Sequence, residues 1–194
     1  MVVSGKTLMP DVGVLSILMQ IQNTSSVLQN FLNMTQIHPM LIGGQDVSSD
    51  IAPIVSVNPA TGKENHRVAA AGAADVDHAV HVAAQAAAHP AWRQMLPPQR
   101  ARILGRIADL MERDAEAIAG LQMMENGKVW RECTAQVKSA AATFRYYAAV
   151  CEVTGSDVTP PRGDYLSLVA HEPYGVVAAI TPWNSPLTME AQKV

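Results

Sequence analysis

The most informative segment of the sequence reads Glu172-Pro173-Tyr174-Gly175-Val176-Val177-Ala178-Ala179-Ile180-Thr181-Pro182-Trp183-Asn184-Ser185-Pro186-Leu187. Residues 175–180 are continuously apolar, which is typical of a strand buried on both faces of a parallel sheet. Thr181-Pro182 ends this run abruptly, and we expect a helix after the turn. Because a parallel strand needs neighbours that are reached by long crossovers, the segment predicts an α/β fold.

The turn after this strand is the expected position of a ligand site. In open α/β sheets, ligands bind just beyond the carboxyl ends of the strands. The side-chain amide of Asn184 can donate a hydrogen bond to an oxygen that develops negative charge. Asparagine is also a preferred helix N-cap, so Asn184 has a second interpretation as the residue that caps the following helix. The residues alone leave both interpretations open.

Upstream of this segment, the patterns predict a hairpin and four helices. Strands are expected where short apolar runs meet Gly, Pro and Asn turns, at residues 40–42, 54–57 and 66–69. Helical spacing of apolar residues begins near Asp75, Pro97 and Asp114, and the fourth helix carries Val137, Ala141, Phe144, Ala148 and Cys151. Residues 165–171 alternate with a period of two and predict a further strand. Only fourteen residues follow Ile180, so we expect the sheet of the apolar strand to be incomplete.

Length and composition favour one ordinary globular domain. The chain has 194 residues, of which 48% are hydrophobic and 16% are charged. Its 14 basic and 17 acidic residues are scattered, so no basic surface for nucleic acid is expected. No run approaches the roughly 18 apolar residues of a membrane span.

No metal site is expected either. The two cysteines, Cys133 and Cys151, lack the Cys-x-x-Cys spacing of metal ligands. His78 and His81 lie one helical turn apart, but no third ligand follows at a usable spacing. We interpret these histidines as part of a solvated helix face.

Residues 1–38 differ from the rest of the chain. Their apolar stretch at 12–19 is short, and they lack the arginines and the cleavage site of targeting peptides. We predict a loosely ordered extension, or residues upstream of a true start at Met34 or Met40, and a cytoplasmic protein. The remaining chain is predicted to divide into a hairpin and helical part (39–154), an oligomerisation-type β segment (155–172), and the apolar strand with its turn (173–194).

Several of these segments resemble the NAD(P)-dependent aldehyde dehydrogenase family. The most specific match is Pro182-Trp183-Asn184, which resembles the Pro-Trp-Asn segment of that family. Weaker matches occur in the family's order: Ile42-Gly43-Gly44, Asn58-Pro59-Ala60-Thr61-Gly62, Ala74-Asp75-Val76-Asp77, Arg100-Ala101, Glu125-Asn126-Gly127-Lys128 and Phe144-Arg145-Tyr146-Tyr147-Ala148. The resemblance covers residues 39–194 and implies the N-terminal part of a Rossmann-type cofactor domain.

This resemblance implies roles for residues at the turn. In the family, the residue matching Asn184 donates to the thiohemiacetal oxyanion, and the lysine matching Lys193 lies at the active-site floor, where a proton relay has been suggested. The backbone bordering the nicotinamide of NAD or NADP matches Thr181, Pro182, Trp183 and Asn184. We assign the Trp183 side chain to packing, because an indole beside a strand end buries a large apolar area.

The resemblance also implies that the nucleophilic cysteine and the general-base glutamate lie beyond the position matching Val194. Cys133 and Cys151 are not expected to replace that cysteine, because a thiol buried on a helix has a raised pKa and little nucleophilicity. We therefore expect an N-terminal fragment of an enzyme that oxidises a small-molecule aldehyde to a carboxylic acid, inactive by itself. The complete enzyme is expected to be a homo-oligomer.

Polar residues follow the turn where the family often has aromatic or apolar ones. Spacings of three and four place Ser185, Thr188 and Gln192 on one helix face, which with Met189 matches the family's aldehyde tunnel. A polar lining favours a substrate with polar groups, because a plain alkyl aldehyde leaves donors unpaired. Ordinary variation within the family is the alternative explanation.

A competing hypothesis is a non-catalytic remnant. Residues 165–171 resemble the strand through which the family oligomerises, and an exposed strand edge can pair with another chain. Such a protein would act as an oligomerisation or interaction partner of full-length subunits.

Overall fold

The computed structural model of the chain describes residues 37–160 and 163–194. These residues form two compact units, the first made of 37–56 and Glu64–Arg93 and the second of Val57–Lys63 and Gln94–Val194. The prediction for 1–38 lies outside the described residues except at its end, where Ile37 and His38 form a strand. The four-part division of the chain expected from the sequence stays a prediction.

The first unit contains short strands. They are β1 (Ile37–His38), β2 (Met40–Ile42), β3 (Gln45–Val47), β4 (Ile54–Val57) and β5 (Glu64–Val68). β2 and β3 pair antiparallel across Gly43-Gly44, and both glycines have positive φ, as this tight hairpin turn requires. β1 pairs in parallel with β5, giving the order β1-β5-β4. The three strands expected around residues 40–42, 54–57 and 66–69 are thereby confirmed.

The helices of the first unit are α3 (Ala73–Ala88) and α4 (Pro90–Arg93). The Asp75 carboxylate accepts a hydrogen bond from the Gly72 backbone N–H at 2.8 Å, which stabilises the start of α3 close to the expected position. Val76 and Val80 are exposed, so they do not form the packing face of α3. Val82 packs closely against Gly43 of the hairpin turn instead.

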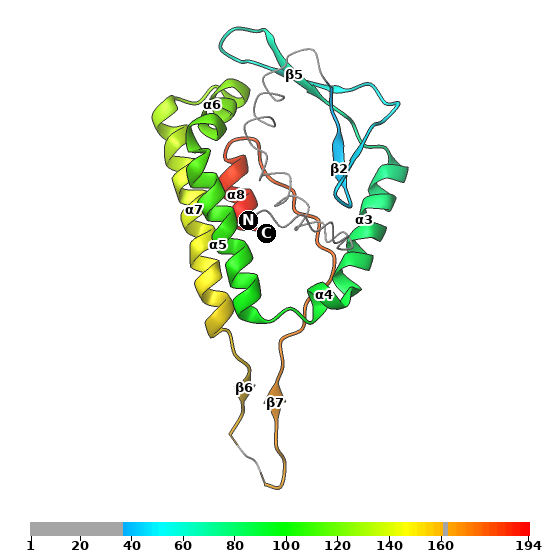
Figure 1. Cartoon of the computed structure of the whole chain (residues 1–194), viewed down its shortest axis with the longest axis vertical. Coiled ribbons are helices and arrows are strands. Elements are labelled where there is room, and N and C mark those ends of the chain that lie inside the picture. The colour runs from blue at the N-terminus through cyan, green and yellow to red at the C-terminus, as the bar shows by residue number, and fades with distance from the viewer. Residues whose placement is uncertain (1–36, 161–162) are drawn as a thin grey trace, which may run out of the picture. The chain divides into compact units, whose positions relative to one another are not determined.

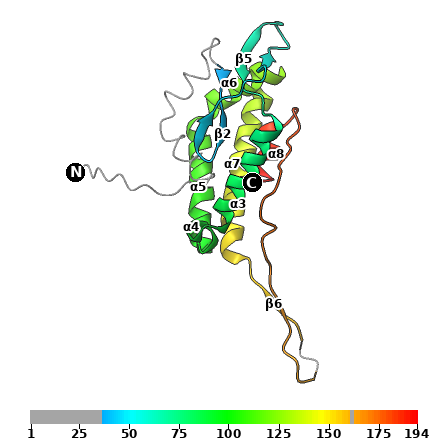
Figure 2. The same cartoon turned by 90° about the vertical axis from the view of Figure 1, so that its right-hand side faces the viewer.

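The second unit is built on helices. These are α5 (Pro97–Arg113), α6 (Ala115–Asn126), α7 (Trp130–Val153) and α8 (Pro186–Ala191). Figure 1 shows α5 and α7 packed along each other with α8 beside them, and the turned view in Figure 2 agrees. The helices beginning at Pro97 and close to Asp114, and the helix that carries Phe144, are confirmed.

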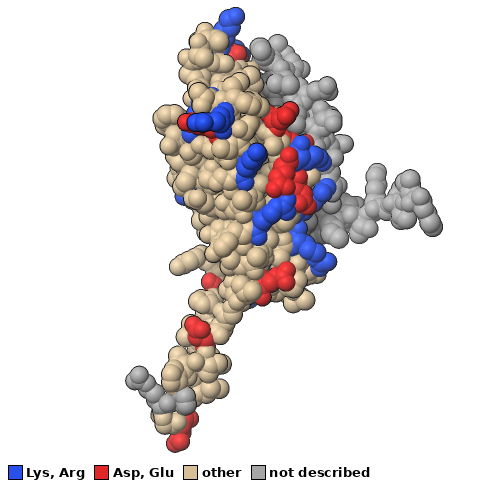
Figure 3. Space-filling view, turned by 90° about the vertical axis from the view of Figure 1, so that its left-hand side faces the viewer, with Lys and Arg blue, Asp and Glu red and all other residues tan. Residues whose placement is uncertain are grey.

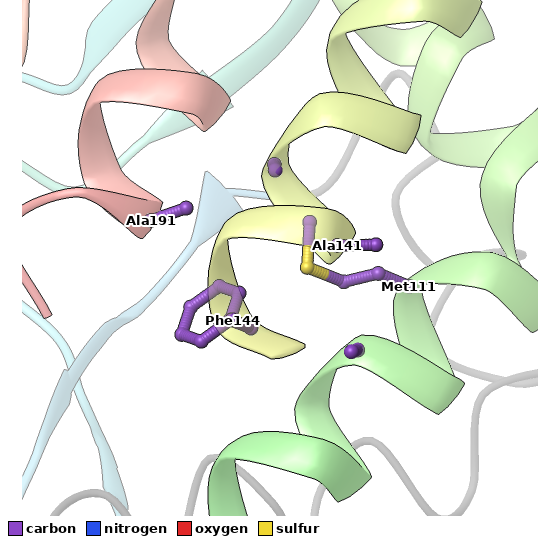
Figure 4. Close-up of a cluster of buried hydrophobic side chains, with 6 residues drawn as sticks. Met111, Ala141, Phe144 and Ala191 are labelled. Carbon is purple, nitrogen blue, oxygen red and sulfur yellow. The ribbon is translucent and has the colours of Figure 1, made fainter. Parts of the chain in front are cut away.

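Two clusters of buried side chains hold these helices together. The larger one joins α5, α7 and α8 (Figure 4), and its members are Ala108, Met111, Ala140, Ala141, Phe144 and Ala191. The smaller one consists of Ala119, Cys133 and Val137. Small alanines let the helices approach closely, while Phe144 and Met111 supply most of the apolar volume.

A two-stranded ribbon follows α7. β6 (Asp157–Val158) pairs antiparallel with β7 (Leu168–Val169), and the ribbon runs away from the end of α7 (Figures 1 and 2). The strand predicted at 165–171 is thus present, but its ladder is shorter than the sequence pattern suggested.

The buried strand predicted at 175–180 is wrong for this structure. These residues have no regular secondary structure and are all exposed; Ile180, for example, is 84% exposed. A strand requires a partner for its backbone N–H and C=O groups. No neighbouring strand reaches this segment within the described part of the chain, so its amides stay in water. The α/β class itself is confirmed as a partial domain.

No helix in the described ranges is both long and apolar enough to span a membrane.

Candidate functional site

The turn at residues 181–184 is exposed and leads directly into α8. The N-cap of α8 is Ser185, and no side chain of the described residues makes a capping hydrogen bond there. The interpretation of Asn184 as the helix cap is therefore wrong. The Asn184 side chain is exposed, and no group in the described ranges hydrogen bonds to it.

A chain of hydrogen bonds connects this turn to the helical core. The Gln136 Nε2 donates to the Ser185 Oγ at 3.2 Å. The Gln122 Nε2 donates to the Gln136 Oε1 at 2.6 Å, and Gln122 is only 6% exposed. We call Gln122, Gln136 and Ser185 the glutamine relay; it joins α6 and α7 to the N-cap of α8.

Apolar contacts fix the other side of α8. Ala191 is buried in the larger cluster, and Leu187 packs against both clusters. Thr188 Oγ1 is enclosed and has no hydrogen-bond partner among the residues that the structure describes. The helix is therefore held in place by packing and by the glutamine relay together.

Lys193 and Gln192 lie at the far end of α8. Both are exposed and border a groove of about 290 Å³ that Tyr147 and Cys151 also line. Asn184 is not among the lining residues of this groove. The predicted proton-relay lysine therefore borders this groove, whereas the predicted oxyanion donor does not.

The two cysteines occupy different environments. Cys133 is fully buried and its thiol donates to the Lys128 carbonyl oxygen at 3.9 Å. Burial raises the pKa of the Cys133 thiol, and the hydrogen bond to Gln122 and the charge of Lys128 oppose that rise only in part. Cys151 is partly exposed on the groove.

The predicted tunnel residues do not form one common polar surface. The Ser185 hydroxyl is directed to Gln136, the Thr188 hydroxyl is enclosed, and Gln192 borders the groove. Met189 is half-buried on the same helix. The packing assigned to Trp183 is absent in the described chain, because its side chain is 78% exposed.

Sequence reasoning missed Gln122 and Gln136. A signal was present: Gln122 lies three residues after Ala119 and four after Ile118, on the face of α6 that packs inward. A polar side chain on an inward face must find a buried partner. Gln136 supplies that partner from the neighbouring helix.

Basic and acidic side chains lie together on the described face of the molecule drawn in Figure 3. Figure 3 shows basic and acidic side chains intermingled on one face, without an extended patch of one sign. Between α7 and α5, Arg145 contacts Asp109 at 3.0 Å and also pairs with Glu112, so this basic side chain lies beside two acidic ones. No group of His, Cys, Asp or Glu side chains suited to a metal ion occurs in residues 37–160 and 163–194.

These features define a partial α/β domain in which an apolar segment and an exposed Trp-Asn turn precede a helix docked on a helical core. Residues 47–194 match the aldehyde dehydrogenase family. The chain belongs to the aldehyde dehydrogenase family.

Relatives of known sequence agree with this assignment. The chain is 40% identical over 142 residues to the horse mitochondrial aldehyde dehydrogenase, covering 72% of this chain and 28% of the relative. It is 38% identical over 139 residues to human retinal dehydrogenase 2, covering 71% of this chain and 27% of the relative.

Solved structures agree as well. The NAD⁺ complex of a Bacillus cereus aldehyde dehydrogenase superposes with a TM-score of 0.81 at 33% identity, covering 86% of this chain and 34% of that one. The chain therefore spans about a third of the length of the relatives it matches.

Proposed function

We propose that these residues form the N-terminal part of an enzyme that oxidises an aldehyde to a carboxylic acid with NAD or NADP. The observation that carries the proposal is the Asn184 amide, exposed in the turn that α8 anchors and within the region matching the family. The 194 residues by themselves are proposed to be inactive.

Asn184 is the proposed catalytic residue of this chain. As an aldehyde is attacked, its oxygen gains negative charge, and the Asn184 Nδ2 can donate a hydrogen bond to it without adding a charge of its own. Neither Cys133 nor Cys151 is proposed as the nucleophile. Burial keeps the Cys133 thiol protonated, and Cys151 lies on the groove, which does not include Asn184.

The turn fits the cofactor that the resemblance implies. Residues 181–184 are all exposed, so a planar nicotinamide ring can approach them without displacing packed side chains. Thr181, Pro182, Trp183 and Asn184 are the residues proposed to border the ring. When bound, NAD(P) supplies the acceptor for the hydride of the aldehyde. Lys193 is proposed to act as a proton relay.

The substrate class is proposed from α8. Thr188, Met189 and Gln192 are the proposed tunnel lining, together with Ser185, whose hydroxyl oxygen already accepts from Gln136. A polar lining favours aldehydes with polar groups over long alkyl aldehydes. A preference for long-chain aldehydes in an enzyme carrying this helix would contradict this substrate class.

A chimera tests the proposal directly. Residues 47–194 would replace the matching segment of the Bacillus cereus aldehyde dehydrogenase, and NADH formation would be measured with a short aldehyde. We expect turnover in the chimera and none in the 194-residue chain. Asn184→Ala should lower kcat by about 10²–10³-fold, the usual cost of removing one oxyanion donor.

The matched control for Asn184→Ala is Gln94→Ala, which removes the side-chain amide of an exposed residue and should keep the activity. Turnover by the 194-residue chain alone, or full activity of the Asn184→Ala chimera, would refute the assignment.

A second candidate function is supported by the ribbon of β6 and β7. Tyr165, Leu166 and Leu168 are each at least 65% exposed, and the short ladder offers open strand edges. Exposed apolar strand edges pair readily with other chains. This favours a role of the ribbon in joining subunits, as an oligomerisation partner or a non-catalytic remnant.

Sedimentation of the 194-residue chain tests this second candidate. We expect concentration-dependent association that Leu168→Lys weakens, because a charge on the ribbon opposes pairing. A monomer at all concentrations would contradict it.

A further inference from the structure

Ser185 occupies the N-cap of α8 but does not use its hydroxyl as a cap. A serine at this position normally accepts a hydrogen bond from a backbone N–H in the first turn of its helix. Here no such capping bond exists in the described chain, and the Ser185 Oγ accepts from Gln136 Nε2 instead. The hydroxyl therefore makes a tertiary contact between residues that are 49 positions apart in the sequence.

The Gln136 side chain also makes a second hydrogen bond, to Gln122. Its Oε1 accepts from Gln122, a nearly buried side chain on α6, and the neighbouring Val137 is fully buried in the smaller cluster. Two hydrogen bonds orient the Gln136 amide, one at each end. An amide so constrained presents its N–H to a defined point in space.

We propose that Gln136 is a positioning residue that sets the orientation of the turn bearing Asn184. Ser185 follows Asn184 directly, so fixing the Ser185 side chain restricts the backbone dihedrals on which the Asn184 amide depends. Leu187 and Ala191 fix the body of α8 to the core, and the relay fixes its N-cap residue, Ser185. The catalytic meaning of this inference rests on the function proposed above.

The chemistry of the relay distinguishes two substitutions of Gln136. Gln136→Leu removes both the donor to Ser185 and the acceptor for Gln122. In Gln136→Glu, a carboxylate can accept from the Gln122 Nε2 and from the Ser185 hydroxyl proton, so both links persist with the second one reversed. Gln136→Glu should therefore keep Ser185 in place, whereas Gln136→Leu should not.

Hydrogen–deuterium exchange of the 194-residue chain tests the positioning role without any enzyme assay. The reporter is the peptide covering α8, in which the Met189 N–H bonds to the Ser185 carbonyl oxygen at 3.1 Å. We expect exchange in α8 to rise about tenfold in Gln136→Leu and to stay within about twofold of the unmodified chain in Gln136→Glu. Peptides from α5 should not change.

Two further variants keep the test decisive. Ser185→Ala removes a single oxygen and should reproduce the effect of Gln136→Leu, and the double variant should add nothing to either one. Lys138→Leu makes a comparable change on an exposed part of α7 and should leave α8 unaffected. Unchanged α8 exchange in Ser185→Ala, or equal acceleration in α5 and α8, would overturn the proposal.

An activity measurement separates this inference from the proposed function. In the Bacillus cereus chimera, Gln136→Leu should lower kcat about tenfold with KM within about twofold, because a misplaced donor weakens transition-state stabilisation more than substrate binding. A chimera that is inactive with Gln136 intact refutes the proposed function and leaves the exchange result standing. An active chimera with an unchanged kcat in Gln136→Leu refutes the positioning role alone.

Discussion

Gly127 ends helix α6 and also leaves room for a neighbouring turn to pack against the end of that helix. It is the C-cap of α6 and has a φ of 72°, the left-handed conformation that glycine adopts at little cost. A Cβ atom built on it would lie 2.7 Å from the Pro59 Cγ. The turn at residues 58–62 therefore packs against the end of α6 because position 127 has no side chain.

Gly127→Ala is expected to reduce the free energy of unfolding by about 2–3 kcal/mol. The left-handed conformation accounts for about 1–2 kcal/mol of this loss, and the contact with Pro59 accounts for the rest. Urea denaturation followed by circular dichroism would measure it. The matched control is Gly105→Ala inside α5, where a Cβ meets nothing within 4 Å, and which should stabilise the protein by about 0.5–1 kcal/mol. Similar effects of the two substitutions would be inconsistent with this account.

At the scale of the elements, the pairing of β1 with β5 brings two histidines into contact. His38 on β1 and His66 on β5 are both nearly buried, and their ring centroids are 5.5 Å apart in an edge-to-face arrangement. Burial lowers the pKa of His38, and the charge of His66 lowers it further. The folded pair therefore favours a neutral His38.

The pairing of β1 with β5 is expected to weaken as the pH falls. A histidine has a pKa of about 6.5 in the unfolded chain, so below that pH the unfolded chain binds a proton that folded His38 resists. Stability contributed by neutral His38 is present above about pH 6.5 and is lost as the pH falls toward the lower folded value. The thermal midpoint should drop between pH 7.5 and pH 6.0.

Two variants test whether His38 causes this fall of the thermal midpoint with pH. In His38→Asn the drop should be smaller, because the titrating group is gone. His78→Asn on the exposed face of α3 should keep the full drop. An unaltered pH dependence in His38→Asn would exclude His38 as its source.

At the scale of the whole molecule, the apolar segment at residues 174–183 is left uncovered by any sheet of the described residues. Tyr174, Val177, Ile180 and Trp183 are between 67% and 101% exposed. Contiguous apolar surface of this kind marks a place where other protein surface binds. It directly precedes the anchored α8, so whatever covers it also adjoins the proposed site.

The 194-residue chain is expected to bind a hydrophobic fluorescent dye through this segment. Val177→Ser with Ile180→Ser should reduce dye fluorescence and shift the unfolding free energy by no more than about 0.5 kcal/mol, since neither side chain is packed. The control, Ala178→Ser with Ala179→Ser, changes little apolar area and should retain the dye signal. Equal dye binding by both pairs would place the apolar surface elsewhere.

Helices and turns were the most predictable parts of the fold. Local rules suffice for them: Asp75 stabilises the first turn of α3, Gly127 ends α6, and the spacing of Val137, Ala141 and Phe144 marks the buried face of α7. The pattern for α3 failed at Val76 and Val80, because which face is buried depends on the hairpin that packs there.

The sequence by itself determined the family, the order of the longer helices and the position of the Trp-Asn turn, since motifs and periodicity are local properties of the chain. Only the tertiary structure decided that Asn184 is not a cap, that Ser185 bonds to Gln136, and that residues 175–180 stay unpaired. Each of these depends on which distant group lies within hydrogen-bond reach, and sequence spacing does not specify that. A backbone with no neighbouring strand keeps its hydrogen bonds with water, however strongly its side chains favour burial.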